Sequence, residues 1–97
     1  MALKTTKFDA VDYLDTPEDI AAYLEAAFED GTPALITAAL GDVARSHGMT
    51  RLARDAGVAR EALYRALSEG GNPEFATVLK VVKALGLSLT VAPAKAA

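Results

Sequence analysis

Several kinds of residue are missing or scarce in this 97-residue chain, and each absence excludes a class of site. No cysteine is present, which excludes a disulfide framework and thiolate chemistry. His47 is the single histidine, so a histidine-based zinc site or catalytic apparatus is hard to assemble. No nucleophile–base pair, pair of carboxylates in a plausible cleft or phosphate loop is recognisable. We therefore expect no enzyme, small-molecule substrate, cofactor or metal.

Long apolar runs are also missing. None approaches the roughly 18 residues of a transmembrane helix, and residues 1–15 lack the apolar core of a signal peptide. We expect a cytoplasmic protein with no membrane contact. The length suits one small domain with a single modest core. Hydrophobic residues make up 52% of the chain but aromatic ones only 6%, which fits closely packed short helices better than a β-sandwich.

Basic residues are absent from one part of the chain. Residues 8–42 carry nine acidic side chains and no basic one, whereas residues 43–83 carry seven basic against four acidic. Although the net charge is −3, residues 43–83 therefore carry an excess of positive charge that suits a polyanion. The acidic part repels nucleic acid and suits a basic protein partner.

Helix starts and stops are clearly marked. A cap residue followed by proline is typical of a helix start and occurs at Thr16-Pro17, Thr32-Pro33 and Asn72-Pro73. Glycines typical of helix ends follow at Gly31, Gly48, Gly57, Gly70 and Gly86. Together with apolar residues at helical spacing, they predict helices over residues 17–30, 33–47, 50–56, 59–68 and 73–85.

After the last helix the pattern changes to alternation. Leu87-Ser88-Leu89-Thr90-Val91 has a period of two, which predicts a short strand over 87–91. A lone strand has no partner in an otherwise helical chain, so it pairs with another chain or lies as an exposed edge. Pairing with its own copy through Leu87, Leu89 and Val91 predicts a homodimer.

The stretch from Met49 to Asn72 has the layout of a helix pair that reads DNA. Ala53 is small where two helices cross closely, and Gly57 can adopt the positive φ of a tight turn. A second helix begins two residues later. The arrangement leaves basic and polar side chains outside and indicates a helix-turn-helix. These side chains are Arg51, Arg54, Arg60, Tyr64 and Arg65.

The order of the helices around this pair resembles the lambda-repressor-like DNA-binding domains. Residues 8–91 are similar, more closely, to the HigA-like antitoxins, the antidotes of addiction modules. The similarity rests on YLDTPEDIAAYL, GDVARSHGM, GNPEFATVLKVVKALG and the closing strand. It implies a single all-α domain over 8–91, with an acidic segment (8–30), a helix-turn-helix (50–68) and the strand. It also implies a homodimer that neutralises a basic RelE/ParE-like toxin and represses its own operon.

The resemblance implies a set of DNA-binding residues. Arg60, Glu61 and Arg65 lie on the exposed face of the reading helix, which starts at Ala59 without the usual Ser or Thr cap. Arginine can bind guanine, Glu61 can accept from cytosine or pair with Arg65, and Ala59 can touch a thymine methyl. Thr50 and Arg51, at the start of the preceding helix, are expected to contact phosphates. Tyr64 either contacts a phosphate or covers the edge of the core. Asn72 either caps a helix or contacts a phosphate.

The acidic segment before the first helix mixes carboxylates with apolar side chains. A solvated face is its ordinary explanation, but an acidic and apolar surface also suits a toxin. The candidate toxin-binding residues are Phe8, Asp9, Val11, Asp12, Tyr13, Leu14 and Asp15. Two other functions stay open: a stand-alone repressor without a toxin, and an interaction module that binds no nucleic acid.

Overall fold

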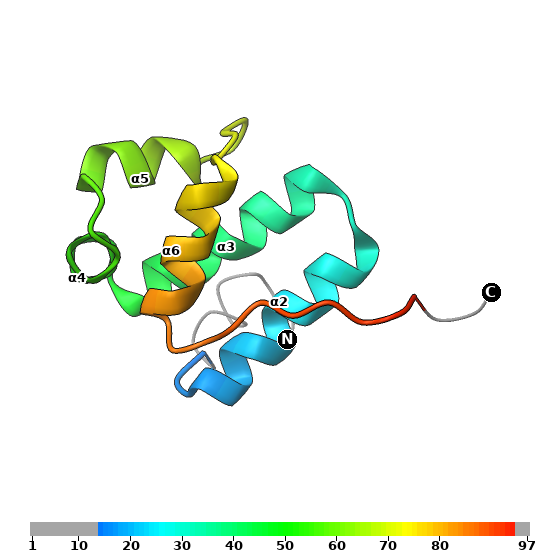
Figure 1. The fold of residues 1–97 in the computed structure, drawn as a ribbon. Coiled ribbons are helices and arrows are strands. Elements are labelled where there is room, and N and C mark those ends of the chain that lie inside the picture. The colour runs from blue at the N-terminus through cyan, green and yellow to red at the C-terminus, as the bar shows by residue number, and fades with distance from the viewer. Residues whose placement is uncertain (1–13, 95–97) are drawn as a thin grey trace, which may run out of the picture.

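The computed structural model describes residues 14–94, which form five helices (Figure 1). α2 (Pro17–Asp30) packs against α3 (Pro33–His47). α4 (Met49–Ala56) contacts α3, α5 (Arg60–Ala66) and α6 (Phe75–Ala84). The expected all-helical class is confirmed for this part of the chain. None of the helices in residues 14–94 combines the length and apolarity needed to cross a bilayer.

Most helix ends follow the local signals. Thr16 caps α2, because its Oγ1 accepts a hydrogen bond from the Asp19 N–H at 3.1 Å. The five glycines expected past helix ends all have positive φ. The prediction that the Thr32 side chain caps α3 was wrong, because its hydroxyl makes no cap hydrogen bond. The Thr32 backbone N–H donates to Asp30 Oδ2 at 3.2 Å.

The start of α6 is a second correction. The Asn72-Pro73 pair predicted a helix from residue 73, but α6 begins at Phe75 after Glu74. The preceding loop lies close to the end of α5. Gly71 N–H donates to the Ser68 carbonyl at 2.7 Å, and a Cβ on Gly71 would overlap backbone carbonyls at the end of α5. This close approach sets the course of the loop, so Asn72 caps no helix.

The core lies where the helices meet. Its most deeply buried large side chains come from α3, α4, α5 and α6: Leu40, Val43, Leu52, Leu63 and Val81. Burying each contributes about 1.5–3 kcal/mol. Gly41 permits a close approach of α3 to the end of α5, since a Cβ there would lie 2.6 Å from the Leu67 carbonyl oxygen. Some apolar side chains of the helices remain exposed, among them Phe28, Leu35, Phe75 and Leu79.

The strand expected over 87–91 does not form within residues 14–94 of the single chain. Leu87 packs against the core, and its N–H donates to the Val82 carbonyl at 3.1 Å. The chain then runs across α2 without regular structure (Figure 1). A strand is defined by a ladder to a second strand, and this part of the chain offers none. Leu89 and Val91 remain exposed, at 41% and 98%.

Candidate nucleic-acid interface

The helix pair α4–α5 is built around a tight turn. Gly57 ends α4 with φ 75° and ψ 33°, as its place in the sequence predicts. The Val58 N–H donates to the Ala53 carbonyl at 3.0 Å, which closes the turn. Leu52 and Leu63 are fully buried on the inner side, and Ala53 is 3% exposed. The inner faces are therefore apolar and closely packed, and the polar side chains of both helices point outward.

All eight residues expected to bind DNA are exposed. They comprise two from the start of α4, five from the start and outer face of α5, and one from the following loop: Thr50, Arg51, Ala59, Arg60, Glu61, Tyr64, Arg65 and Asn72. The structure thus brings seven of them onto one helix pair, whereas Asn72 lies in the loop before α6.

One hydrogen bond joins the two helices on this outer side. Arg60 Nε donates to Thr50 Oγ1 at 2.9 Å, across the turn from the first residue of α5 to the second of α4. An arginine held through Nε keeps its terminal nitrogens free to donate elsewhere. The sequence pattern placed both residues on the interface but did not show this contact.

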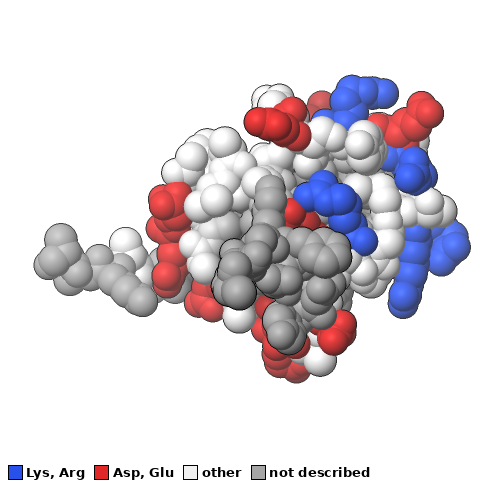
Figure 2. All heavy atoms as spheres, turned by 180° about the vertical axis from the view of Figure 1, so that it is seen from behind, with Lys and Arg blue, Asp and Glu red and all other residues white. Residues whose placement is uncertain are grey.

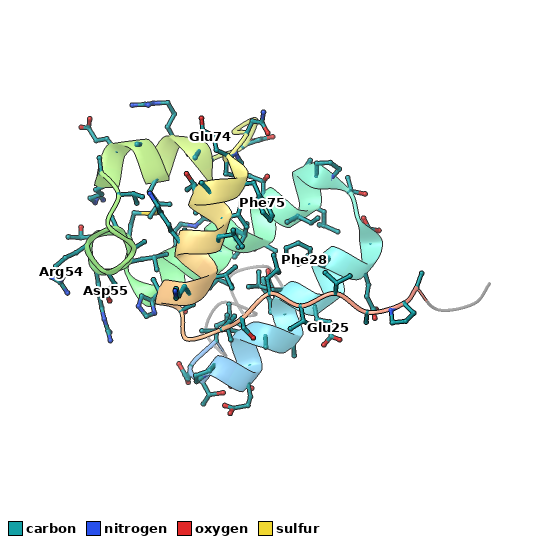
Figure 3. All side chains as sticks on the ribbon, viewed as in Figure 1. Glu25, Phe28, Arg54, Asp55, Glu74 and Phe75 are labelled. Atoms are coloured by element: carbon teal, nitrogen blue, oxygen red, sulfur yellow. The ribbon has the colours of Figure 1, made fainter. Side chains whose placement is uncertain are left out.

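The charge of the helix pair is concentrated on the same side. Arginines 51, 54, 60 and 65 are exposed on α4 and α5. Figure 2 shows basic side chains gathered at this end of the molecule and acidic ones mainly over α2. Arg54 and Asp55 project outward from α4 and form an exposed ion pair of 3.7 Å (Figure 3). Such a pair is weak, so it leaves the Arg54 charge accessible to another anion.

The start of α5 lacks a side-chain cap, as expected. Ala59 occupies the cap position with φ −68° and ψ 136° and makes no side-chain cap hydrogen bond. A Ser or Thr at this position would stabilise the helix by about 1 kcal/mol. His47 also takes its expected place as the last residue of α3. Its Nε2 is buried and has no hydrogen-bond partner among the described residues.

The expected toxin-binding residues are placed only in part. Phe8, Asp9, Val11, Asp12 and Tyr13 lie outside the described residues 14–94. Asp15 is exposed, but the Leu14 side chain is in the core with 8% exposure. Leu14 therefore anchors the chain before α2, and its side chain is covered on the folded surface.

The sequence pattern did not predict the buried polar cluster that lies between α2 and α3. Asp42, 2% exposed, accepts hydrogen bonds from Tyr23 Oη and from Arg45 Nη2, both at 2.6 Å. Burial raises the pKa of Tyr23 from 10.0 to about 12, and the hydrogen bond to Asp42 and the carboxylate charge act in the same direction. The available signal was an acidic residue beside the apolar stripe of α3, with an arginine three positions later.

Comparison with known proteins identifies the family. Residues 4–93 match the model of a family described as probable addiction module antidote proteins. The chain belongs to this family. A relative from Haemophilus influenzae, itself an uncharacterised protein, is 50% identical over 84 residues, which cover 87% of each chain. No solved structure matches the chain. An antidote acts on a toxin, so membership implies a toxin partner.

Proposed function

We propose that this chain is an antitoxin that binds a basic RelE/ParE-like toxin directly and represses its own operon through α4 and α5. The exposed, arginine-rich outer side of this helix pair is the observation that carries the DNA-binding part. Family membership supports the antitoxin part. In this proposal the order of helices is that of HigA-like antitoxins with a lambda-repressor-like helix-turn-helix, and α5 is the reading helix.

The reading helix acts through two arginines with different surroundings. Arg65, in the last turn of α5, is exposed and makes no ion pair within residues 14–94. Arg60 is oriented by its hydrogen bond to Thr50. A guanidinium that binds guanine O6 and N7 bidentately contributes about 1–3 kcal/mol of discrimination against the wrong base. Glu61, between them, can accept from cytosine N4.

DNA binding is tested with single alanine substitutions. Arg60→Ala and Arg65→Ala should each weaken binding to the upstream DNA by about 5- to 150-fold in a gel shift, with a smaller loss on scrambled DNA. Lys83→Ala is the matched control, since it removes one exposed charge from α6, outside the helix pair. Equal losses on both DNA sequences would make the two arginines phosphate contacts. Wild-type protein that binds neither DNA would contradict the repressor function.

The proposed antitoxin works as a homodimer joined at residues 87–91. Leu89 and Val91 are exposed there. Among residues 14–94, the backbone hydrogen bonds between chain segments stop at Leu87, so the following N–H and C=O groups are open to a second strand. A two-fold dimer presents two reading helices to two half-sites of a palindrome.

Toxin binding is tested by co-expression with the product of the adjacent reading frame. A basic protein should co-purify with this chain, and its toxicity should be suppressed. In the proposal, the acidic segment takes part in docking, so deletion of residues 1–13 should weaken neutralisation and spare operator binding. The deletion stops before Leu14, because loss of that buried side chain would destabilise the fold. Operator binding without a co-purifying partner would instead identify a stand-alone repressor.

A further inference from the structure

A shallow groove lies between α2 and the C-terminal segment, residues 86–94. One wall is α2 from Pro17 to Glu29, and the other is the segment that crosses it (Figure 1). Leu24, Val82 and Leu87 line it beside the core. The groove is at a distance from the outer face of α4–α5, so the DNA-binding proposal does not use it.

The groove offers apolar side chains that the fold itself leaves uncovered. Phe28, in the last turn of α2, is 38% exposed, and Leu89, on the opposite wall, is 41% exposed. Glu25 and Phe28 both project from α2 beside the crossing segment (Figure 3). An aromatic side chain exposed in a concave site is a common anchor of protein interfaces.

The charge around the groove has one sign. Three of its lining residues are carboxylates on α2, namely Glu18, Glu25 and Glu29, and no lysine or arginine among residues 14–94 lines it. This rim disfavours a second copy seated in the groove itself, because a two-fold axis through the groove would bring the same carboxylates together. The dimer proposed above pairs the backbone edge of residues 87–91 instead. The rim also excludes nucleic acid. The complementary occupant is a segment with apolar side chains on one side and basic side chains on the other.

We propose that this groove binds a basic amphipathic segment of the toxin. The inference rests on the antitoxin function proposed above and assigns to it a docking site. The groove begins at Pro17, two residues after the exposed Asp15, so its glutamates continue the run of carboxylates in the sequence. Phe28 anchors the apolar side of the bound segment, and the glutamates attract its basic side. The rim charges increase the association rate, whereas the apolar contacts slow dissociation.

The test measures the affinity of purified toxin for groove variants by calorimetry and its association rate by surface binding. Phe28→Ala should weaken toxin binding about tenfold or more. Glu25→Lys should slow association, and the effect should shrink as salt rises. Glu25→Lys keeps the helix, because lysine and glutamate have nearly the same helix propensity.

Two controls make the same chemical changes outside the groove. Phe75→Ala truncates an aromatic that is 67% exposed at the start of α6, and Glu69→Lys reverses an exposed charge in the loop after α5. Both should bind toxin within about twofold of wild type. Circular dichroism of all four variants checks that they stay folded.

The outcomes separate the two proposals. If wild type binds toxin and the groove variants bind as tightly as the controls, the groove assignment is wrong and the antitoxin function stands. If wild type binds no toxin, both proposals fall. A third outcome is self-association that rises with concentration and is lost in Glu25→Lys. It would assign the groove to the basic α4–α5 end of another copy and overturn the toxin assignment.

Discussion

Tyr23→Phe tests whether the buried cluster between α2 and α3 stabilises the fold. The substitution removes only the hydroxyl that donates to Asp42 Oδ2 at 2.6 Å. Asp42 is 2% exposed, so that oxygen loses its partner with little water to replace it. A hydrogen bond to a charged group contributes about 1.5–3 kcal/mol. The free energy of unfolding should fall by about this amount, and the midpoint of thermal unfolding by roughly 10 °C.

Urea unfolding followed by far-ultraviolet circular dichroism measures the change. Protein concentration must be the same throughout, because the proposed dimerisation would shift apparent stability. Tyr64→Phe is the matched control: it makes the same change on a ring that is 54% exposed, and should stay within about 0.5 kcal/mol of wild type. A Tyr23→Phe protein as stable as the control would refute the assigned role of the hydrogen bond.

The same cluster predicts a dependence on alkaline pH. The folded protein raises the pKa of Tyr23 from 10.0 to about 12, so the folded state holds this proton more tightly than the unfolded state. The resulting stability is complete below pH 10 and is lost as the pH rises toward 12. Two pKa units correspond to about 2.7 kcal/mol, which partial exposure reduces to about 1 kcal/mol. Tyr23→Phe should lack this part of the alkaline decline; an identical decline in both proteins would contradict the assignment.

Three further predictions follow from other contacts. Gly41→Ala should destabilise the protein by about 1–2 kcal/mol in urea unfolding, because its Cβ would lie 2.6 Å from the Leu67 carbonyl oxygen and the overpacking outweighs alanine's helix propensity. Thr50→Val should weaken operator binding several-fold in a gel shift with unchanged thermal stability, because Arg60 loses its 2.9 Å acceptor. Deletion of residues 88–97, which keeps the core contact of Leu87, should leave a helical monomer by sedimentation; a truncated protein that stays a tight dimer would place dimerisation elsewhere.

The helix bounds were predictable where one local signal dominates. At α2, Thr16 and Pro17 at the start and Gly31 at the end leave the backbone one low-energy arrangement, and the structure follows it. At α6, the Asn72-Pro73 signal competes with the packing of Gly71 against the end of α5. A tertiary contact of this kind outweighs a cap of about 1 kcal/mol. Sequence alone does not show which of the two is stronger.

The sequence predicted which residues lie on the surface of the candidate interface, but not the contacts between their side chains. Within each helix, a residue two positions after an inward-facing one lies on the opposite side, so once Leu52 and Leu63 face inward, Arg54 and Arg65 face outward, which the structure confirms. Helical periodicity does not show which residues of two different helices come into contact. The Arg60–Thr50 bond and the burial of Asp42 under Tyr23 depend on how helices are placed in space, so they emerged only from the structure.

The C-terminal segment shows why a period of two is not enough to predict a strand: a strand needs a second strand to pair with, and residues 14–94 offer none. With a period of two, Leu87, Leu89 and Val91 would share one face of a strand. In the single chain only Leu87 packs against the core. Val91 remains 98% exposed, next to a backbone without hydrogen bonds to the rest of residues 14–94. Open edges with apolar side chains promote association.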